Sequence, residues 1–170
     1  LLIQKKSVEP IESKTELKLF EEDSILFLGR LSIQKSPWHL INAFKLVLET
    51  NPNTNLIFIG DGDRVNACKN LTKRMNLQER ISFLGVQNNI GGYLKLADYV
   101  VMSSHYEGFG RAAIEGMAAG KPVIASNVPG LANIVKGAGL LFEPGNENML
   151  SQIILKLSED KNMYKEVANK

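Results

Sequence analysis

The chain has 170 residues, of which 44% are hydrophobic and 22% are charged, and its formal net charge is +2. These values are typical of one soluble domain, and so small a charge gives no electrostatic reason to expect a nucleic-acid partner. The single cysteine, Cys68, excludes a disulfide framework and is compatible with a reducing, cytoplasmic compartment. The apolar runs are far shorter than the roughly 18 residues of a spanning helix. Because the chain begins with Leu1 rather than methionine, we expect a piece of a longer protein.

Short apolar runs alternate with longer helical patterns along the chain. The runs that predict strands are residues 24–29, 55–60, 81–84, 99–102, 121–125 and 140–142. The first helix is expected to begin with Ser36 as its cap and Pro37 at its first position, with Leu40, Phe44 and Val47 on one face. Further helices are predicted at residues 65–75, before 97, and at 110–119, 131–135 and 148–158, with helical turns after 161.

Strands that are apolar throughout, each followed by a helix, predict a doubly wound α/β domain. We expect residues 24–170 to form a parallel, six-stranded, Rossmann-like sheet with helices on both faces. Residues 1–23 are charged and only sparsely apolar, so they are predicted to be a linker or the first edge of the domain. Ligands of such sheets bind outside the carboxyl ends of the strands, which makes the strand-to-helix loops the candidate sites.

The loop after the first predicted strand carries two cations, Arg30 and Lys35, and leads into a helix. Cationic side chains and free backbone N–H groups in one loop are what a diphosphate requires. An ordinary solvated loop with two basic residues is the alternative interpretation.

The loop after the fourth predicted strand also leads into a helix. Its glycines, Gly108 and Gly110, let a ligand approach the backbone at the helix N-terminus, where N–H groups favour phosphate oxygens. Glu107 precedes this helix and Glu115 lies within it, and carboxylates at an anion site are suited to sugar hydroxyls. Alternatively, Arg111 and Glu115 form only an ion pair four residues apart on the helix.

A third loop, which contains Asp61 and Gly62, is explained by turn chemistry alone, and the full Gly-x-Gly-x-x-Gly pattern of dinucleotide sites is absent. Gly85 and Val86 follow the third predicted strand at the same edge. Cys68 falls on the apolar stripe of a predicted helix, so we expect it to be a packed thiol.

Taken together, these loops resemble the carboxyl-terminal, donor-binding domain of family 4 (group 1) glycosyltransferases, which have the two-domain GT-B fold. Glu107 and Glu115 form the Glu-x7-Glu element of that family, which is highly specific. The stretches that carry the resemblance are residues 29–35, 59–62, 83–85, 107–125 and 139–142.

The resemblance implies a retaining transferase that moves a sugar from a nucleotide-diphosphate sugar to an acceptor hydroxyl. The expected donor is a UDP-sugar or else a GDP-sugar, with no other cofactor and no bound metal at this site. Arg30 and Lys35 would hold the diphosphate, Glu107 would contact the donor sugar, and Glu115 would accept from the ribose hydroxyls. Backbone groups would contact the sugar and phosphate at Gly108, Phe109, Gly110 and Arg111, and the base at Gly85 and Val86.

Three positions depart from the family pattern. Ser36 stands where glycine is usual, Arg111 replaces an apolar residue, and Asn133 stands where glutamate is common. The Arg111 replacement leaves the donor preference open.

The amino-terminal GT-B domain, which would bind the acceptor, is absent from these 170 residues, so we expect the chain alone to be inactive. The expected context is surface or lipid-linked glycan synthesis, either in the cytoplasm or at the inner face of the membrane. A nucleotide-sugar epimerase and a non-catalytic nucleotide-binding module on the same fold remain alternative interpretations.

Overall fold

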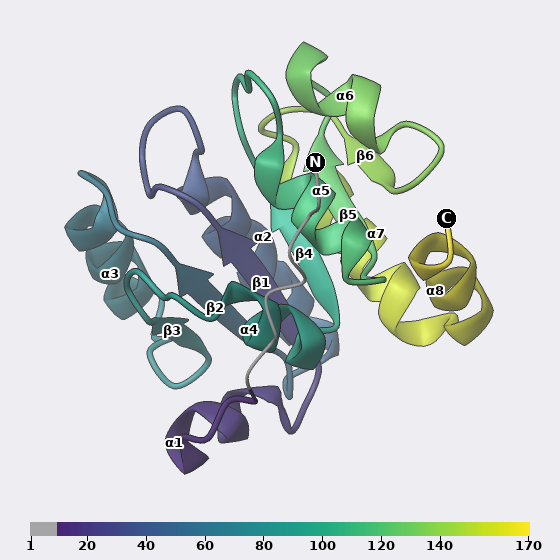
Figure 1. Cartoon of the computed structure of the whole chain (residues 1–170). Helices are drawn as coiled ribbons and strands as arrows, with labels where there is room; N and C mark the ends of the chain where they lie inside the picture. Colours follow the sequence, from purple (N-terminus) through teal and green to yellow (C-terminus); the bar gives the residue numbers. More distant parts are fainter. Residues whose placement is uncertain (1–9) are drawn as a thin grey trace.

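Six parallel strands form the sheet in the computed structural model, which describes residues 10–170 (Figure 1). The strands are β1 (Ser24–Leu28), β2 (Asn55–Ile59), β3 (Ile81–Phe83), β4 (Tyr99–Met102), β5 (Val123–Ser126) and β6 (Leu140–Phe142). Their order is β3-β2-β1-β4-β5-β6, and every neighbouring pair is parallel. The predicted doubly wound α/β class is therefore confirmed.

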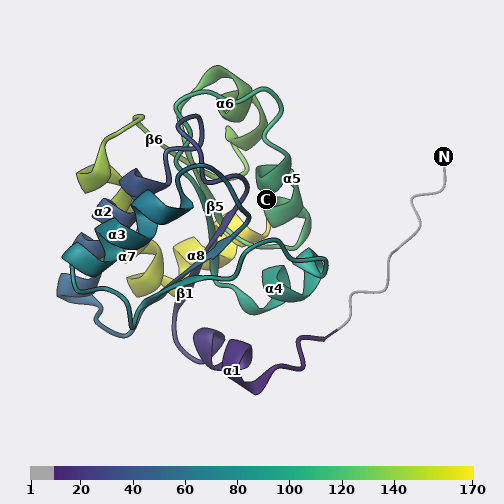
Figure 2. The same ribbon diagram turned by 90° about the vertical axis from the view of Figure 1, so that its left-hand side faces the viewer.

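Helices cover both faces of this sheet. Helices α2, α3 and α7 lie on one face, and α4, α5 and α6 lie on the other (Figure 2). The helical elements are α1 (Lys14–Leu17), the 3-10 turn η1 (Lys18–Phe20), α2 (Pro37–Thr50), α3 (Val65–Arg74), α4 (Ile90–Leu96), α5 (Arg111–Ala118), α6 (Pro129–Val135), α7 (Glu147–Glu159) and α8 (Lys161–Ala168). Among the described residues, no helix is both long enough and apolar enough to cross a membrane.

Alternate residues of each central strand enter two separate hydrophobic cores. In β1, Ile25 and Phe27 pack into the core under α2, whereas Leu26 and Leu28 pack into the core under α4 and α5. Because both faces are covered, all five residues of β1 are buried, which explains why residues 25–28 are all apolar rather than alternating with polar residues.

The order in which strands are added to the sheet reverses between β1 and β4. The chain builds outward from β1 through β2 to β3, then returns to the other side of β1 with β4. The helices that follow β1 and β4, α2 and α5, consequently lie on opposite faces of the sheet, and the loops that lead to them border a crevice at its carboxyl edge. This topological switch point is where the two predicted loops meet.

The predicted linker or edge segment, residues 1–23, is described from residue 10 onward, so the prediction for residues 1–9 lies outside the described residues. The segment contains α1 and η1, and Leu19 and Phe20 pack against the core under α4 and α5. Asn55 Nδ2 donates to the Leu19 carbonyl oxygen at 3.1 Å. Residues 10–23 are thus seated on the domain.

Ser36 begins α2 differently from the prediction. Its side chain does not cap the helix: Ser36 Oγ donates to the Ile33 carbonyl oxygen at 2.8 Å. The residue has φ +47°, a left-handed conformation that glycine adopts at lower cost. Backbone conformation therefore explains why glycine is usual here in the family, and serine retains it with the help of this local hydrogen bond.

Cys68 provides a test of the core under α3. Its side chain is 2% exposed, and burial raises the pKa of the thiol to about 11, while Arg64 lowers it slightly. Because only the thiolate reacts with disulfide reagents, we expect Cys68 to react with Ellman's reagent at pH 8 at least about 100-fold more slowly in the folded chain than in urea. Similar rates in the two states would contradict the packed-thiol assignment.

Candidate active site

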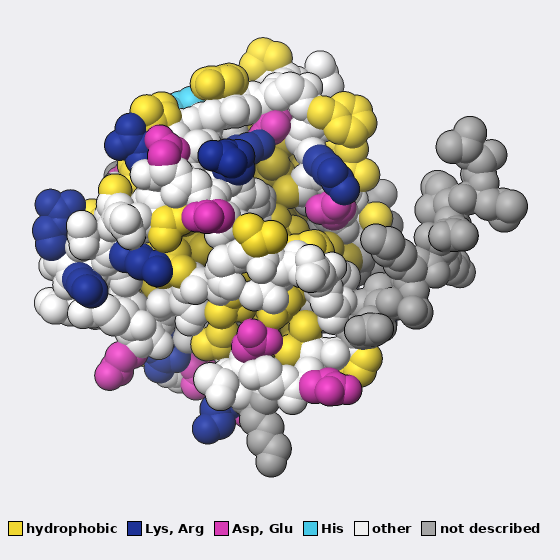
Figure 3. Space-filling view, turned by 60° about the vertical axis from the view of Figure 1, so that its left-hand side comes forward, with side chains coloured by type: hydrophobic (Ala, Val, Ile, Leu, Met, Phe, Trp, Pro, Cys, Tyr) yellow, Lys and Arg dark blue, Asp and Glu magenta, His cyan; other side chains and the backbone are white. Residues whose placement is uncertain are grey.

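A cavity of about 370 Å³ opens at the carboxyl ends of β1 and β2, a size within the range of small-molecule sites. Figure 3 shows apolar surface in a hollow in the upper part of this face, with basic and acidic side chains beside it. The lining residues come from the loops after β1, β2, β3 and β4 and from α4 and α5: Leu28, Gly29, Lys35, Ile59, Gly60, Val86, Gln87, Ile90, Glu107, Phe109, Gly110, Arg111, Ala112 and Glu115.

The ion pair of Lys35 and Glu107 joins the two sides of the switch point. Lys35 Nζ donates to Glu107 Oε2, and Ser104 Oγ donates to the same carboxylate oxygen at 3.3 Å. The Glu107 side chain is only 9% exposed and that of Lys35 is 20% exposed. A carboxylate so little exposed requires a compensating cation, so each side chain fixes the position of the other.

Backbone and serine hydrogen bonds hold the two loops together beneath this ion pair. Ser103 Oγ donates to the carbonyl oxygens of Lys35 and Ser36, at 3.1 Å and 3.0 Å. The His105 N–H donates to the Gln34 carbonyl oxygen at 2.8 Å. These contacts place the loop after β4 against the loop after β1, and they explain why Ser103 is buried although it is polar.

The N-terminus of α5 forms another wall of the cavity. Gly110 lies at the N-cap with φ +61°, a left-handed conformation that glycine adopts readily. The first two residues of the helix, Arg111 and Ala112, line the cavity. N–H groups in the first turn of a helix favour anions. Arg111 Nε and Glu115 Oε1 lie 3.3 Å apart, so the ion pair of the alternative interpretation is present; Arg111 is 86% exposed and Glu115 38%.

Not every predicted residue lies in the cavity wall. Arg30 is exposed, and it is its neighbour Gly29 that belongs to the wall. Gly108 lies between lining residues, and Gly85 lines an adjoining cavity that shares Gly60 and Val86 with the first. The roles assigned to the predicted site residues remain predictions.

Sequence reasoning missed Gln87 and Ile90, which form the cavity wall between β3 and α4. Asn89 caps α4, with its side chain accepting from the Gly92 N–H. A polar residue at that position, directly before an apolar segment, was the available signal for a helix start at this edge.

Asp61 and Asp63 have the spacing of a metal-binding carboxylate pair, yet both are exposed and locally engaged. Asp61 Oδ1 accepts from the Gly62 N–H at 2.8 Å, and Asp63 lies 3.7 Å from Arg64. Within residues 10–170, no group of three or more His, Cys, Asp or Glu side chains is arranged to hold a metal ion.

The fold and the crevice at its switch point are those of one domain of a GT-B glycosyltransferase. The sequence model of the family described as glycosyl transferases group 1 matches residues 9–170. The chain belongs to that family, and the resemblance inferred from its motifs is confirmed.

Two curated relatives illustrate the range of this family. An uncharacterised glycosyltransferase of Methanocaldococcus jannaschii is 39% identical over 127 residues, which are 74% of this chain and 31% of the relative. The UDP-Gal:alpha-D-GlcNAc-diphosphoundecaprenol alpha-1,3-galactosyltransferase of Escherichia coli is 32% identical over 155 residues, 87% of this chain and 40% of the relative. The chain therefore spans less than half the length of either relative.

Solved structures give the same result. HepE of Anabaena in complex with UDP and glucose superimposes with a TM-score of 0.84 and 29% identity, covering 91% of this chain and 43% of that protein. The C-terminal domain of the group 1 glycosyl transferase LpcC from Francisella tularensis superimposes with a TM-score of 0.79 and 26% identity, covering 95% of this chain and 90% of that domain. This chain accordingly has the fold of the carboxyl-terminal GT-B domain.

The backbone of α6 packs closely against the backbone of the 107–110 loop at Gly130, where a Cβ atom would overlap the Glu107 carbonyl oxygen. We expect Gly130→Ala to lower the free energy of unfolding by about 1–3 kcal/mol, because the 107–110 loop must move. Gly108→Ala is the matched control, since a Cβ there meets nothing within 4 Å, and it should change stability by no more than about 1 kcal/mol. Urea denaturation measures both, and equal effects of the two substitutions would contradict this packing.

Proposed function

We propose that this chain is the donor-binding domain of a retaining glycosyltransferase, which binds a nucleotide-diphosphate sugar and transfers its glycosyl group to an acceptor hydroxyl. The observation that carries the proposal is the Lys35–Glu107 pair in the wall of a cavity that the first turn of α5 also lines. It combines a cation, helix N–H groups and a carboxylate within one crevice. The likeness to HepE, solved with UDP and glucose, supports the choice of ligand.

Each part of the wall has a separate task in this proposal. Lys35 and the first turn of α5 hold the diphosphate, and Arg30 adds positive charge from the exposed rim. As the bond between the anomeric carbon and the phosphate oxygen breaks, its electron pair stays on that oxygen, and these cationic and N–H groups stabilise the negative charge. A UDP-sugar is the favoured donor and a GDP-sugar the second choice, with side chains and helix N–H groups in place of a metal ion.

The sugar and the nucleoside occupy opposite ends of the cavity. Glu107, freed from Lys35 when the diphosphate takes over the ammonium, accepts from the hydroxyls of the donor sugar. Glu115 accepts from the ribose hydroxyls, and the backbone at Gly85 and Val86 reads the base.

The acceptor binds to a second domain that faces this cavity. Four large apolar side chains are exposed in the loops after β1, β3 and β4, namely Ile33, Val86, Tyr106 and Phe109. Exposed apolar surface of this kind is typical of a face that another domain covers. The name of the Escherichia coli relative supports a lipid-linked glycan as the acceptor. We propose that this acceptor is used at the cytoplasmic face of the membrane. The 170-residue chain alone binds nucleotide and transfers nothing.

Calorimetry of the 170-residue chain with UDP and with GDP tests the diphosphate assignment. Lys35→Ala should weaken nucleotide binding about 10- to 100-fold, because a charge-assisted hydrogen bond is lost and Glu107 is left unpaired. Lys45→Ala, which removes an exposed cation of α2, is the control and should bind like the wild type. Equal affinities in the wild type and Lys35→Ala would refute the assignment.

The role of Glu107 is tested in the protein that carries both GT-B domains. Glu107→Gln should reduce kcat about 100-fold, because a neutral amide cannot replace a carboxylate that orients the sugar. Binding of free UDP, which lacks the donor sugar, should change less than about threefold. A parallel loss of turnover and UDP binding would show that Glu107 does not act on the sugar.

A further inference from the structure

One glutamine, Gln87, forms a hydrogen bond within the loop that makes the cavity wall between β3 and α4. Gln87 lines the cavity together with Val86 and Ile90. Its Nε2 donates to the Leu84 carbonyl oxygen at 2.8 Å, across the turn that contains Gly85. This hydrogen bond therefore helps to fix the position of the turn beside the cavity. Val86, which is 74% exposed, lies in that turn.

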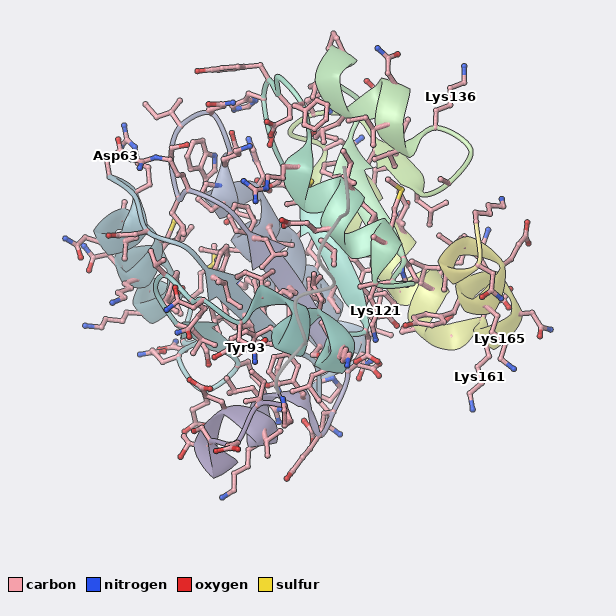
Figure 4. All side chains as sticks on the ribbon, in the orientation of Figure 1. Asp63, Tyr93, Lys121, Lys136, Lys161 and Lys165 are labelled. Carbon is pink, nitrogen blue, oxygen red and sulfur yellow. The ribbon has the colours of Figure 1, made fainter. Side chains whose placement is uncertain are left out.

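Tyr93 holds the other end of the Gln87 amide. The tyrosine lies on α4, above α1 in the view of Figure 4, and is 2% exposed. Its hydroxyl donates to Gln87 Oε1 at 3.2 Å and to Glu16 Oε2, on α1, at 2.9 Å. Burial first, and then the hydrogen bond and the charge of Glu16, raise the pKa of Tyr93 to about 12. The hydroxyl thus keeps its proton at neutral pH.

One proton cannot serve two acceptors equally. A phenol carries a single O–H donor, so Gln87 and Glu16 compete for it. Glu16 is the closer acceptor and is charged, and hydrogen bonds to charged groups are the stronger ones. The proton is therefore drawn toward α1, and the hydrogen bond that steadies Gln87 is the weaker of the two.

We propose that Tyr93 is a positioning residue whose hydroxyl steadies the Gln87 wall of the nucleotide cavity, and that Glu16 on α1 weakens this support by competing for the same proton. The inference rests on the proposed function, because it assumes that the wall contacts the nucleoside. In this proposal α1 affects nucleotide binding, through Glu16, as well as leading the chain into β1. When Glu16 moves away from Tyr93, the proton passes to Gln87 and the wall becomes firmer.

Tyr93 also packs through its ring, which lies 6.2 Å from the ring of Phe20 in η1. Tyr93→Phe retains this contact and removes the hydroxyl alone. The substitution therefore separates the hydrogen bond from the packing, provided that the readout distinguishes the wall from the rest of the cavity.

Two ligands provide that readout in calorimetry of the 170-residue chain. UDP reaches the wall, whereas inorganic pyrophosphate reaches only Lys35 and the first turn of α5. We expect Tyr93→Phe to weaken UDP binding about three- to tenfold and to leave pyrophosphate binding within about twofold of the wild type. Tyr164→Phe is the matched control: it removes a hydroxyl that donates to the Asp98 carbonyl oxygen, and both affinities should remain unchanged.

Substitution of Glu16 should have the opposite effect. Glu16→Ala is expected to strengthen UDP binding about twofold, with Glu16→Gln between it and the wild type, because a neutral amide competes less strongly for the proton. In the background of Tyr93→Phe, Glu16→Ala should have no effect, since the proton for which the residues compete is gone. These substitutions lie on partly exposed α1, so they also provide a test if Tyr93→Phe does not fold.

Each result is decisive for one part of the account. UDP binding by Tyr93→Phe equal to that of the wild type would overturn the positioning role, and equal losses of UDP and pyrophosphate binding would reduce Tyr93 to a folding residue. Weaker UDP binding by Glu16→Ala would overturn the competition. A wild-type chain that binds neither ligand contradicts the proposed function, and this inference then fails with it.

Discussion

The Lys35–Glu107 ion pair is the contact on which the arrangement of the site depends. The two residues are 72 positions apart in sequence, in loops that lead to helices on opposite faces of the sheet. Little-exposed charges are stable only when paired, so the ion pair fixes the width of the crevice at the switch point. In the proposed function the diphosphate replaces Glu107 as the partner of Lys35, and the sugar hydroxyls replace Lys35 as the partners of Glu107. The contact between the two side chains therefore satisfies both charged groups.

The framework around the ion pair limits how far either loop can move. Ser103 joins the loop after β4 to the backbone of Lys35 and Ser36, and Ser126 Oγ donates to the Ser104 carbonyl oxygen at 2.5 Å. Close backbone contact at Gly130 supports the same loop from the side of α6. These contacts involve backbone carbonyl groups rather than the two charged side chains, so none of them depends on the Lys35–Glu107 ion pair.

Most of the fold could be predicted from the sequence because its signals are local. Residues 25–28 and 56–59 are apolar at every position, a pattern typical of strands that are covered on both faces, and the structure places β1 and β2 there. Ser36 lies at the N-cap of α2 as predicted, but its backbone is left-handed and its side chain donates back to the Ile33 carbonyl oxygen instead of capping the helix. A serine side chain can either cap a helix or bond back to a preceding carbonyl oxygen, and the neighbouring residues in the sequence do not distinguish these two hydrogen bonds.

The site was predictable to the level of loops but not of contacts. The motifs place Lys35, Glu107 and Glu115 at one edge of the sheet, whereas the exposure of Arg30 and the link from Glu16 to Tyr93 depend on tertiary packing. Glu16 and Tyr93 are 77 residues apart, and no periodic pattern connects them.

A crystal structure of the chain with bound UDP-glucose tests the central claim most directly. The account predicts that Lys35 Nζ leaves Glu107 and lies within hydrogen-bond distance of a diphosphate oxygen, with the glucose hydroxyls at Glu107. A nucleotide seated elsewhere, with the two side chains still bonded to each other, would contradict it.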